Sequence, residues 1–233
     1  MNYEYSYFLV SILSLLIWLI LFFWRRNLRK EMLVMSLLIG FLGLFLGLIY
    51  TLDWWHPLTI TKTIIGFEDF IFGFSLGGTS AVIYEAVFKK RIKIRKIRRK
   101  EEIRQNYNFL FLFTSSLILF LFFFYTLRLN SFYSSIIGLL IPILFTLIKR
   151  KDLIFDSLTS GFLVLIIALI GTNIIEFITP GWVKSSWYFD NLVGIVIFKL
   201  PLEDIIWFFL TGAFIGPLYE FWKEGKLIRI KKN

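Results

Sequence analysis

Two pairs of adjacent carboxylates stand inside apolar stretches of this chain. Glu68 and Asp69 form one pair, and Glu203 and Asp204 form the other. An ionised acidic residue at bilayer depth costs about 2.5–3.5 kcal/mol on insertion scales, so these residues need an explanation. A carboxyl group in a low-dielectric site beside other carboxylates retains its proton through desolvation and like-charge repulsion. A neutral acid of this kind can protonate a substrate, and we predict that all four residues are catalytic.

Other kinds of chemistry are excluded by the composition. The chain has no cysteine, so disulfides, thiolate metal sites and cysteine nucleophiles are absent. Its one histidine, His56, excludes a histidine-rich metal site. Chemistry must therefore use carboxylates, hydroxyls, amides or aromatic rings, and we expect no metal ligands.

The two acidic pairs belong to an internal repeat. A constant offset of 135 residues superposes the segment at 66–85 on the segment at 201–220. The identical pairs are Glu68/Glu203, Asp69/Asp204, Ile71/Ile206, Phe74/Phe209, Gly77/Gly212, Tyr84/Tyr219 and Glu85/Glu220. Apolar identities can follow from composition, but carboxylates in register inside apolar segments cannot. The repeat predicts two equivalent structural units.

Seven apolar segments are long enough to cross a bilayer. The chain has 233 residues, of which 58% are hydrophobic, with a mean hydropathy of +0.74. A spanning helix needs about 20 apolar residues. Such segments lie at 5–24, 33–51, 64–88, 109–127, 132–147, 153–179 and 200–222. The chain is therefore predicted to be an all-α integral membrane protein with seven transmembrane helices.

The basic residues predict the orientation of these helices. Of the 26 Lys and Arg residues, 22 follow the first, third, fifth or seventh segment. The positive-inside bias makes those loops cytoplasmic, which leaves the N-terminus outside and the C-terminus in the cytoplasm. The net charge of +10 and the basic run at 89–104 also suit nucleic acid. Because the charges sit at span ends, facing lipid head groups, we predict no nucleic-acid partner.

An odd number of spans fits the repeat. Three spans end on the side opposite to their start, so a fourth must return the chain before a second unit of three begins. The two three-helix units are then parallel and related by an axis near the membrane normal. We expect a first unit at 1–88, a basic cytoplasmic loop and linker helix at 89–131, and a second unit with a basic tail at 132–233.

Aromatic residues are placed to serve the acidic pairs. Phe72 and Trp207 follow Glu68 and Glu203 by four residues, one turn along the same helix face. Aromatic faces stabilise a cation without trapping it. We predict a substrate-binding set of these two residues with Phe208 and Trp54. The outer-level tryptophans, which are Trp54, Trp55, Trp182 and Trp187, are interpreted first as an interfacial belt.

We predict structural roles for the remaining polar residues in and near the spans. Glu85 and Glu220 lie about 24 Å deeper than the acidic pairs, and we expect them to anchor the cytoplasmic interface with lysine partners. Asp53 and Glu176 are interpreted as solvated span ends, and His56 as an exposed loop residue. The repeated glycines Gly77 and Gly212 are expected where helices pack closely.

The second acidic motif resembles a known enzyme family. Pro201-Leu202-Glu203-Asp204 continues as Ile-Ile-Trp-Phe-Phe, and Trp187-Tyr188 and Gly194-Ile195 precede it. These residues, with the segment Tyr50-Thr-Leu-Asp-Trp54, resemble the heterodimeric-type, flavin-independent lycopene β-cyclases. That family has two homologous three-span domains, separate or fused, each with a Pro-x-Glu-Glu/Asp motif at the start of its third span. In this chain Gly66 stands where the first motif has proline.

The resemblance implies a function. It implies a membrane enzyme that cyclises the linear end groups of lycopene to β-ionone rings, an isomerisation without redox change and without a cofactor. The partners would be a lipophilic carotenoid and the bilayer of the cell membrane. A related enzyme that modifies isoprenoid end groups, a proton-coupled transporter and a non-catalytic scaffold remain alternatives, and homo-oligomerisation is left open.

Overall fold

The computed structural model describes residues 3–94 and 98–229. Within these residues, seven helices are long and apolar enough to cross a membrane, so the chain is a multi-pass membrane protein. The spans are Ser6–Trp24, Arg26–Tyr50, Phe67–Phe88, Arg99–Thr126, Ser131–Lys149, Lys151–Ile178 and Leu202–Lys223. The predicted number of seven spans is confirmed. Four basic residues counted in the orientation argument, Arg95, Lys96, Lys231 and Lys232, lie outside the described residues.

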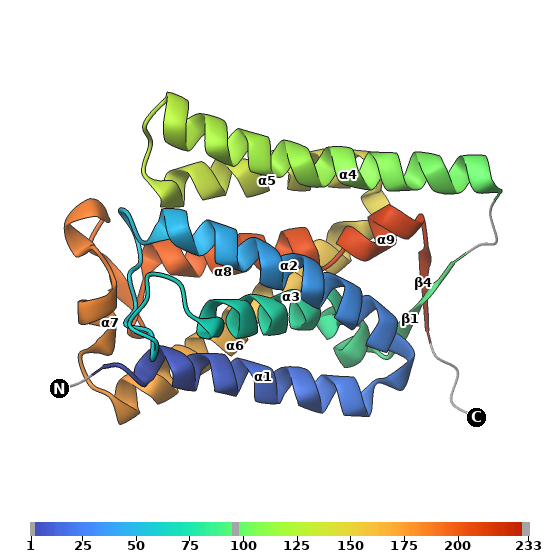
Figure 1. Cartoon of the computed structure of the whole chain (residues 1–233). Helices are drawn as coiled ribbons and strands as arrows, with labels where there is room; N and C mark the ends of the chain where they lie inside the picture. Colours follow the sequence, from blue (N-terminus) through green and yellow to red (C-terminus); the bar gives the residue numbers. More distant parts are fainter. Residues whose placement is uncertain (1–2, 95–97, 230–233) are drawn as a thin grey trace.

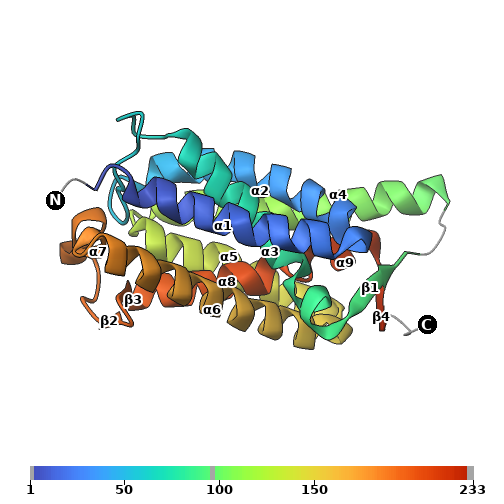
Figure 2. The same cartoon turned by 90° about the horizontal axis from the view of Figure 1, so that it is seen from below.

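The long helices run side by side along one direction (Figures 1 and 2). They are α1 (Ser6–Trp24), α2 (Arg29–Tyr50), α3 (Phe67–Phe88), α4 (Arg99–Leu121), α5 (Ser131–Lys149), α6 (Ile154–Ile178) and α8 (Leu202–Ile215), with the short α7 (Trp182–Ser186) and α9 (Leu218–Lys223). Two-residue strands β2 (Val196–Ile197) and β3 (Leu200–Pro201) pair just before α8, and β1 (Lys90–Lys93) pairs with β4 (Lys226–Arg229). We call the end of the bundle that carries α7 the α7 end, and the end that carries β1 and β4 the strand end.

The two repeated helices, α3 and α8, form the centre of the bundle. Helix α3 packs against α1 and α2, α8 packs against α5 and α6, and the two also contact each other. In an apolar stretch of 18 residues from each span, 67% of the residues are buried in the α3 span and 61% in the span of α8 and α9, against 11% in the α4 span. The acidic helices are thus shielded from lipid, and α4 lies at the edge.

Glycine allows both central helices to approach their neighbours closely. A Cβ atom on Gly77 would lie 2.8 Å from the carbonyl oxygen of Met35 in α2. A Cβ atom on Gly212 would lie 2.8 Å from the carbonyl oxygen of Ser160 in α6. The predicted close packing at these glycines is confirmed, and the contact recurs at the repeat offset. The axis that relates the two units stays a prediction.

Three details differ from the predicted boundaries. Helix α4 begins at Arg99, inside the run expected to be a loop, because Lys, Arg and Glu favour helix even where they cannot enter lipid. Strands β1 and β4 join that run to the C-terminal segment, a long-range pairing that no local pattern indicated. The last span is divided between α8 and α9 at Gly216–Pro217, since proline lacks the N–H that a continuous helix requires.

Candidate active site

Both acidic pairs lie buried at the first turn of their helices, at the α7 end. Glu68 and Asp69 begin α3, and Glu203 and Asp204 begin α8. None of the four side chains is more than 7% exposed, so all four point into the protein. The positive end of a helix dipole favours carboxylates at this position.

The two aspartates have different hydrogen-bond partners. Asp69 accepts a 2.9 Å hydrogen bond from the Tyr7 hydroxyl and another of 2.9 Å from the backbone N–H of Gly66. Asp204 accepts a 2.7 Å hydrogen bond from the indole N–H of Trp187. The position before each helix explains the difference, because Pro201 has no N–H to donate where Gly66 has one.

The two glutamates hold the loops that precede their helices. Oε1 of Glu68 accepts a 2.7 Å hydrogen bond from the backbone N–H of Ile60, and Oε1 of Glu203 accepts one of 2.7 Å from the backbone N–H of Val193. In each glutamate the second carboxylate oxygen is buried without a partner among the described residues. The equivalent residues therefore make equivalent contacts in both halves of the chain.

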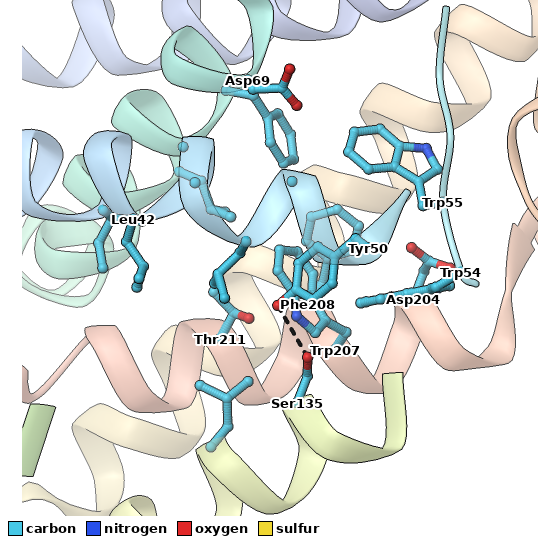
Figure 3. Close-up of a pocket in the computed structure, with 18 of the residues that line it drawn as sticks. Leu42, Tyr50, Trp54, Trp55, Asp69, Ser135, Asp204, Trp207, Phe208 and Thr211 are labelled. Atoms are coloured by element: carbon cyan, nitrogen blue, oxygen red, sulfur yellow. Dashed lines mark hydrogen bonds between the residues drawn. The ribbon is translucent and has the colours of Figure 1, made fainter. Parts of the chain in front are cut away.

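An apolar cavity of about 160 Å³ opens beside the aspartates (Figure 3). Asp69 and Asp204 both line it, and so do the predicted substrate-binding residues Phe72, Trp207, Phe208 and Trp54. Glu68 and Glu203 are buried but are not among the lining residues, so only the aspartate of each predicted catalytic pair reaches the cavity. Adjacent residues on a helix point in different directions, and in each pair it is the aspartate side chain that points toward the cavity.

Aromatic rings form one wall of the cavity. Trp207 packs edge-to-face against Trp54, with ring centroids 5.8 Å apart, and against Tyr50 at 6.3 Å. The Ser135 hydroxyl donates a 3.0 Å hydrogen bond to the Tyr50 oxygen, which fixes the phenol in this wall (Figure 3). These rings present several aromatic faces and edges to whatever occupies the cavity.

The outer tryptophans belong to this site, and the interfacial-belt interpretation is wrong for three of them. Trp54, Trp182 and Trp187 are at most 6% exposed and line the cavity, together with the half-buried Trp55. They are brought together because two loops pair. The N–H of Tyr188 donates to the carbonyl of Trp54 at 3.0 Å, and neighbouring residues of the two loops are hydrogen-bonded as well.

Several lining residues were missed by the sequence analysis. Tyr7 stands near a span end, where a polar aromatic residue is common and carries no distinctive signal. Tyr50 begins the family-like segment, but nothing in the sequence indicated that its ring lines a cavity. Helix α4, predicted only as a linker, contributes four residues to the lining: Phe113, Ser116, Leu117 and Phe120. The sequence of α4 does not show which of its faces points inward. That face is set by how the helix packs against α5.

Two carboxylates predicted as solvated span ends are structural caps, and that interpretation is wrong. Asp53 accepts hydrogen bonds from the N–H and the hydroxyl of Ser131, at the start of α5. Glu176 accepts from the N–H groups of Gly181 and Val183, at the start of α7. His56 packs against Tyr188 with ring centroids 3.9 Å apart and ring planes tilted by 43°. Partial burial lowers the pKa of its imidazole.

The two deep glutamates are also placed differently from the prediction. Glu85 and Glu220 are 0% exposed at the strand end, and no ion pair among the described residues involves either of them. The prediction that lysines pair with these glutamates is wrong, because the glutamate side chains point between helices instead of toward the surface.

Comparison with known proteins is in accord with this geometry. The profile of the lycopene cyclase family matches residues 4–87 and 130–222, which together make up most of the chain. No curated protein and no solved structure gives a match. The matched segments contain both acidic pairs and, to within one residue at an end, every α-helix except α4. The chain therefore belongs to the lycopene cyclase family.

Proposed function

We propose that this protein converts the linear end groups of lycopene into β-ionone rings, with Asp204 as the proton donor. The observation that carries the proposal is the cavity in which two buried aspartates meet a wall of aromatic rings. The family supplies the carotenoid substrate class. The ring type is carried over from the resemblance to the lycopene β-cyclases, and the proton donor is our inference from the site.

The reaction needs an acid, a cation stabiliser and a return path for one proton. Asp204 donates its proton to the terminal alkene, the resulting carbocation closes on the chain to form a carbon–carbon bond, and the ring loses a proton. That proton returns to the Asp204 carboxylate, so substrate and product are isomers and no electrons are exchanged. The aromatic wall around Trp207 stabilises the cation while offering no nucleophile.

We assign different roles to the two aspartates because their surroundings differ. Each hydrogen bond donated to a carboxylate stabilises its ionised form. Asp69 receives two, from Tyr7 and Gly66, whereas Asp204 receives one from Trp187 and only a longer contact from the Trp54 indole. A pair of carboxyl groups held in unequal surroundings can divide the work between acid and ionised partner. We therefore propose that Asp69 remains ionised and stabilises the cation across the cavity.

Glu68 and Glu203 are proposed to position the aspartates. Both hold a loop N–H at the entrance to the helix, one residue before the aspartate that lines the cavity. Their second, unpartnered oxygens remain available for proton exchange with the aspartates.

The cavity accommodates one end group and not a whole carotenoid. A protein cavity of about 150 Å³ holds a benzene molecule, and this cavity has about 160 Å³. A forty-carbon polyene must therefore extend beyond it. Because α4 forms part of the cavity wall and is only 11% buried, we propose that the polyene leaves past α4 into the lipid.

We further propose that the protein lies in the cell membrane with the α7 end outside and the strand end in the cytoplasm. The bias of basic residues toward the strand end supports this orientation. The family match, which leaves out residues 88–129, supports a fused pair of units with α4 as the inserted return helix.

The test is expression in cells that accumulate lycopene, with pigments separated by chromatography. We expect lycopene to be replaced by monocyclic and dicyclic β-ring carotenes in cells carrying the wild-type chain. Unchanged lycopene in cells that contain inserted, folded protein would exclude the proposed substrate. Conversion to a hydrated, acyclic pigment would instead point to a related end-group modification by the same acid.

A further inference from the structure

A second group of carboxylates is buried at the strand end, far from the cavity. Glu85, Asp156 and Glu220 each place a carboxylate oxygen within 4.8 Å of the other two. They come from α3, α6 and α9, and none is more than 1% exposed. Glu85 lies about 25 Å from Glu68 along α3, at 1.5 Å per residue, so this cluster belongs to a separate site.

A fourth carboxylate, from a fourth helix, points at the same cluster. Glu31 in α2 is 2% exposed and interacts electrostatically with Glu85 and Asp156. In the described part of the chain, no N–H or hydroxyl group donates to either of its carboxylate oxygens, and its side-chain contact is the carboxyl group of Glu220. No such group donates to either oxygen of Glu85 or Glu220, whose carboxyl groups contact each other. Buried carboxylate oxygens left without donors require either protons or a cation.

The nearby arginines, Arg25 and Arg150, do not neutralise these carboxylates by direct contact. The guanidinium of Arg25 donates to the backbone carbonyls of Glu85 and Ala86 at 2.9 and 2.8 Å. Arg150 makes equivalent contacts with the backbone carbonyls of Glu220 and Gly225, at 3.4 and 2.9 Å. The two guanidinium groups thus stand beside the cluster without contacting its carboxylates, since Arg25 donates to the main chain and Arg150 donates both to the main chain and to the carboxylate of Asp152.

We infer that Glu31, Glu85, Asp156 and Glu220 form a binding site for one divalent cation of the class that prefers oxygen ligands, such as Mg²⁺, Mn²⁺ or Ca²⁺. Carboxylates alone, without nitrogen or sulfur donors, select this class. The formal charges then balance, because four carboxylates oppose one divalent cation, the Arg25 guanidinium beside Glu85 and the Lys90 ammonium that interacts with Asp156. The Ser160 hydroxyl donates to Asp156 at 3.1 Å and orients that ligand.

The site joins the two halves of the chain. Two of its ligands, Glu31 and Glu85, come from the first half, and the other two come from the second. A cation held by all four would tie α2 and α3 to α6 and α9 at the end of the bundle opposite the cavity. Its role is therefore to fix how the halves meet, and the inference does not rest on the proposed cyclase function.

The experiment uses the full chain, purified in detergent, stripped with EDTA and titrated with Mn²⁺ alone. We expect one saturable Mn²⁺ per chain by electron paramagnetic resonance, displaced by Mg²⁺ or Ca²⁺, and a higher melting temperature with Mn²⁺ bound. The double variant Glu85→Gln/Glu220→Gln should bind Mn²⁺ at least about 100-fold more weakly.

A matched control removes the same charge at the same end of the bundle. Glu102 and Glu224 are exposed and lie outside the cluster. The double variant Glu102→Gln/Glu224→Gln should keep the wild-type affinity. If Glu85→Gln/Glu220→Gln does not fold, the single variant Glu31→Gln replaces it, with an expected loss of about 10-fold.

Two outcomes would overturn the inference. The first is the absence of a saturable Mn²⁺ site in the wild-type chain, which would mean that shared protons neutralise the cluster. The second is an equal affinity in the cluster variant and the control variant, which would place the bound ion elsewhere.

Discussion

The indole N–H of Trp187 donates a 2.7 Å hydrogen bond to Oδ2 of Asp204. Trp187 belongs to the loop that follows α7, and Asp204 begins α8, so this contact fixes the aspartate relative to the loops that cover the cavity. It also places an aromatic ring beside the carboxyl group that we propose as the acid.

Replacement of the proposed acid should remove cyclisation without preventing folding. Asp204→Asn keeps the volume of the side chain but cannot deliver a proton, and general acid catalysis contributes about 10²–10⁴-fold. We expect β-ring carotene formation in lycopene-accumulating cells to fall at least about 100-fold. Asp190→Asn, an exposed change at the same end of the bundle, should leave the product level unchanged.

Glu203→Gln tests whether the acid has been assigned to the right member of the pair. Because Glu203 holds a loop N–H and does not line the cavity, its replacement should reduce activity less than Asp204→Asn does. Full activity in Asp204→Asn with none in Glu203→Gln would transfer the acid role to the glutamate.

Loss of the indole donor should weaken catalysis through the position of Asp204. Trp187→Phe retains an aromatic ring but cannot donate a hydrogen bond to the carboxylate that forms when Asp204 gives up its proton. A hydrogen bond to a charged group is worth about 1.5–3 kcal/mol. We expect kcat to fall roughly 10- to 100-fold, with a much smaller change in KM, in assays with detergent-solubilised lycopene. A change in KM alone would mean that Trp187 only shapes the cavity.

The aromatic wall should affect the rate without being essential. Trp207→Leu removes a cation–π partner worth about 0.5–2 kcal/mol, so we expect roughly a 2- to 30-fold slower conversion. Trp207→Phe should recover part of that loss because it restores an aromatic face. Equal rates for the leucine and phenylalanine variants would show that ring electrons do not stabilise the intermediate.

The close approach of α8 to α6 should make Gly212 intolerant of a side chain. Gly212→Ala places a methyl group 2.8 Å from the Ser160 carbonyl oxygen, and overpacking of this kind costs about 1–3 kcal/mol. Thermal unfolding in detergent should show a lower melting temperature. Gly171→Ala is the control, because its nearest neighbour, Leu13, is 3.7 Å away, and it should be neutral or slightly stabilising.

The orientation can be checked with reporter fusions. A reporter fused after Asn233 should be active in the cytoplasm, and one inserted at Ser185 should be active outside, because most basic residues lie near the strand end. Two reporters on the same side would contradict the proposed topology of seven spans.

The sequence by itself determined the membrane class, the seven spans and the repeated acidic pairs. Each of these depends on a property that is local along the chain, such as the length of an apolar segment or a carboxylate inside it. The predicted substrate-binding residues Phe72 and Trp207 could be found in the same way, because helical spacing places them one turn from the acids.

Only the tertiary structure decided which acid of each pair faces the cavity, and which aromatic residues surround it. Asp204 lines the cavity and Glu203 does not, although they are neighbours in the sequence, because the rotation of α8 against α5 and α6 is set by packing. The same holds for Glu31, whose approach to Glu85 depends on how α2 and α3 pack. Hydropathy and spacing fix what a helix is made of, but its rotation about its own axis is fixed by side-chain volumes that other segments supply.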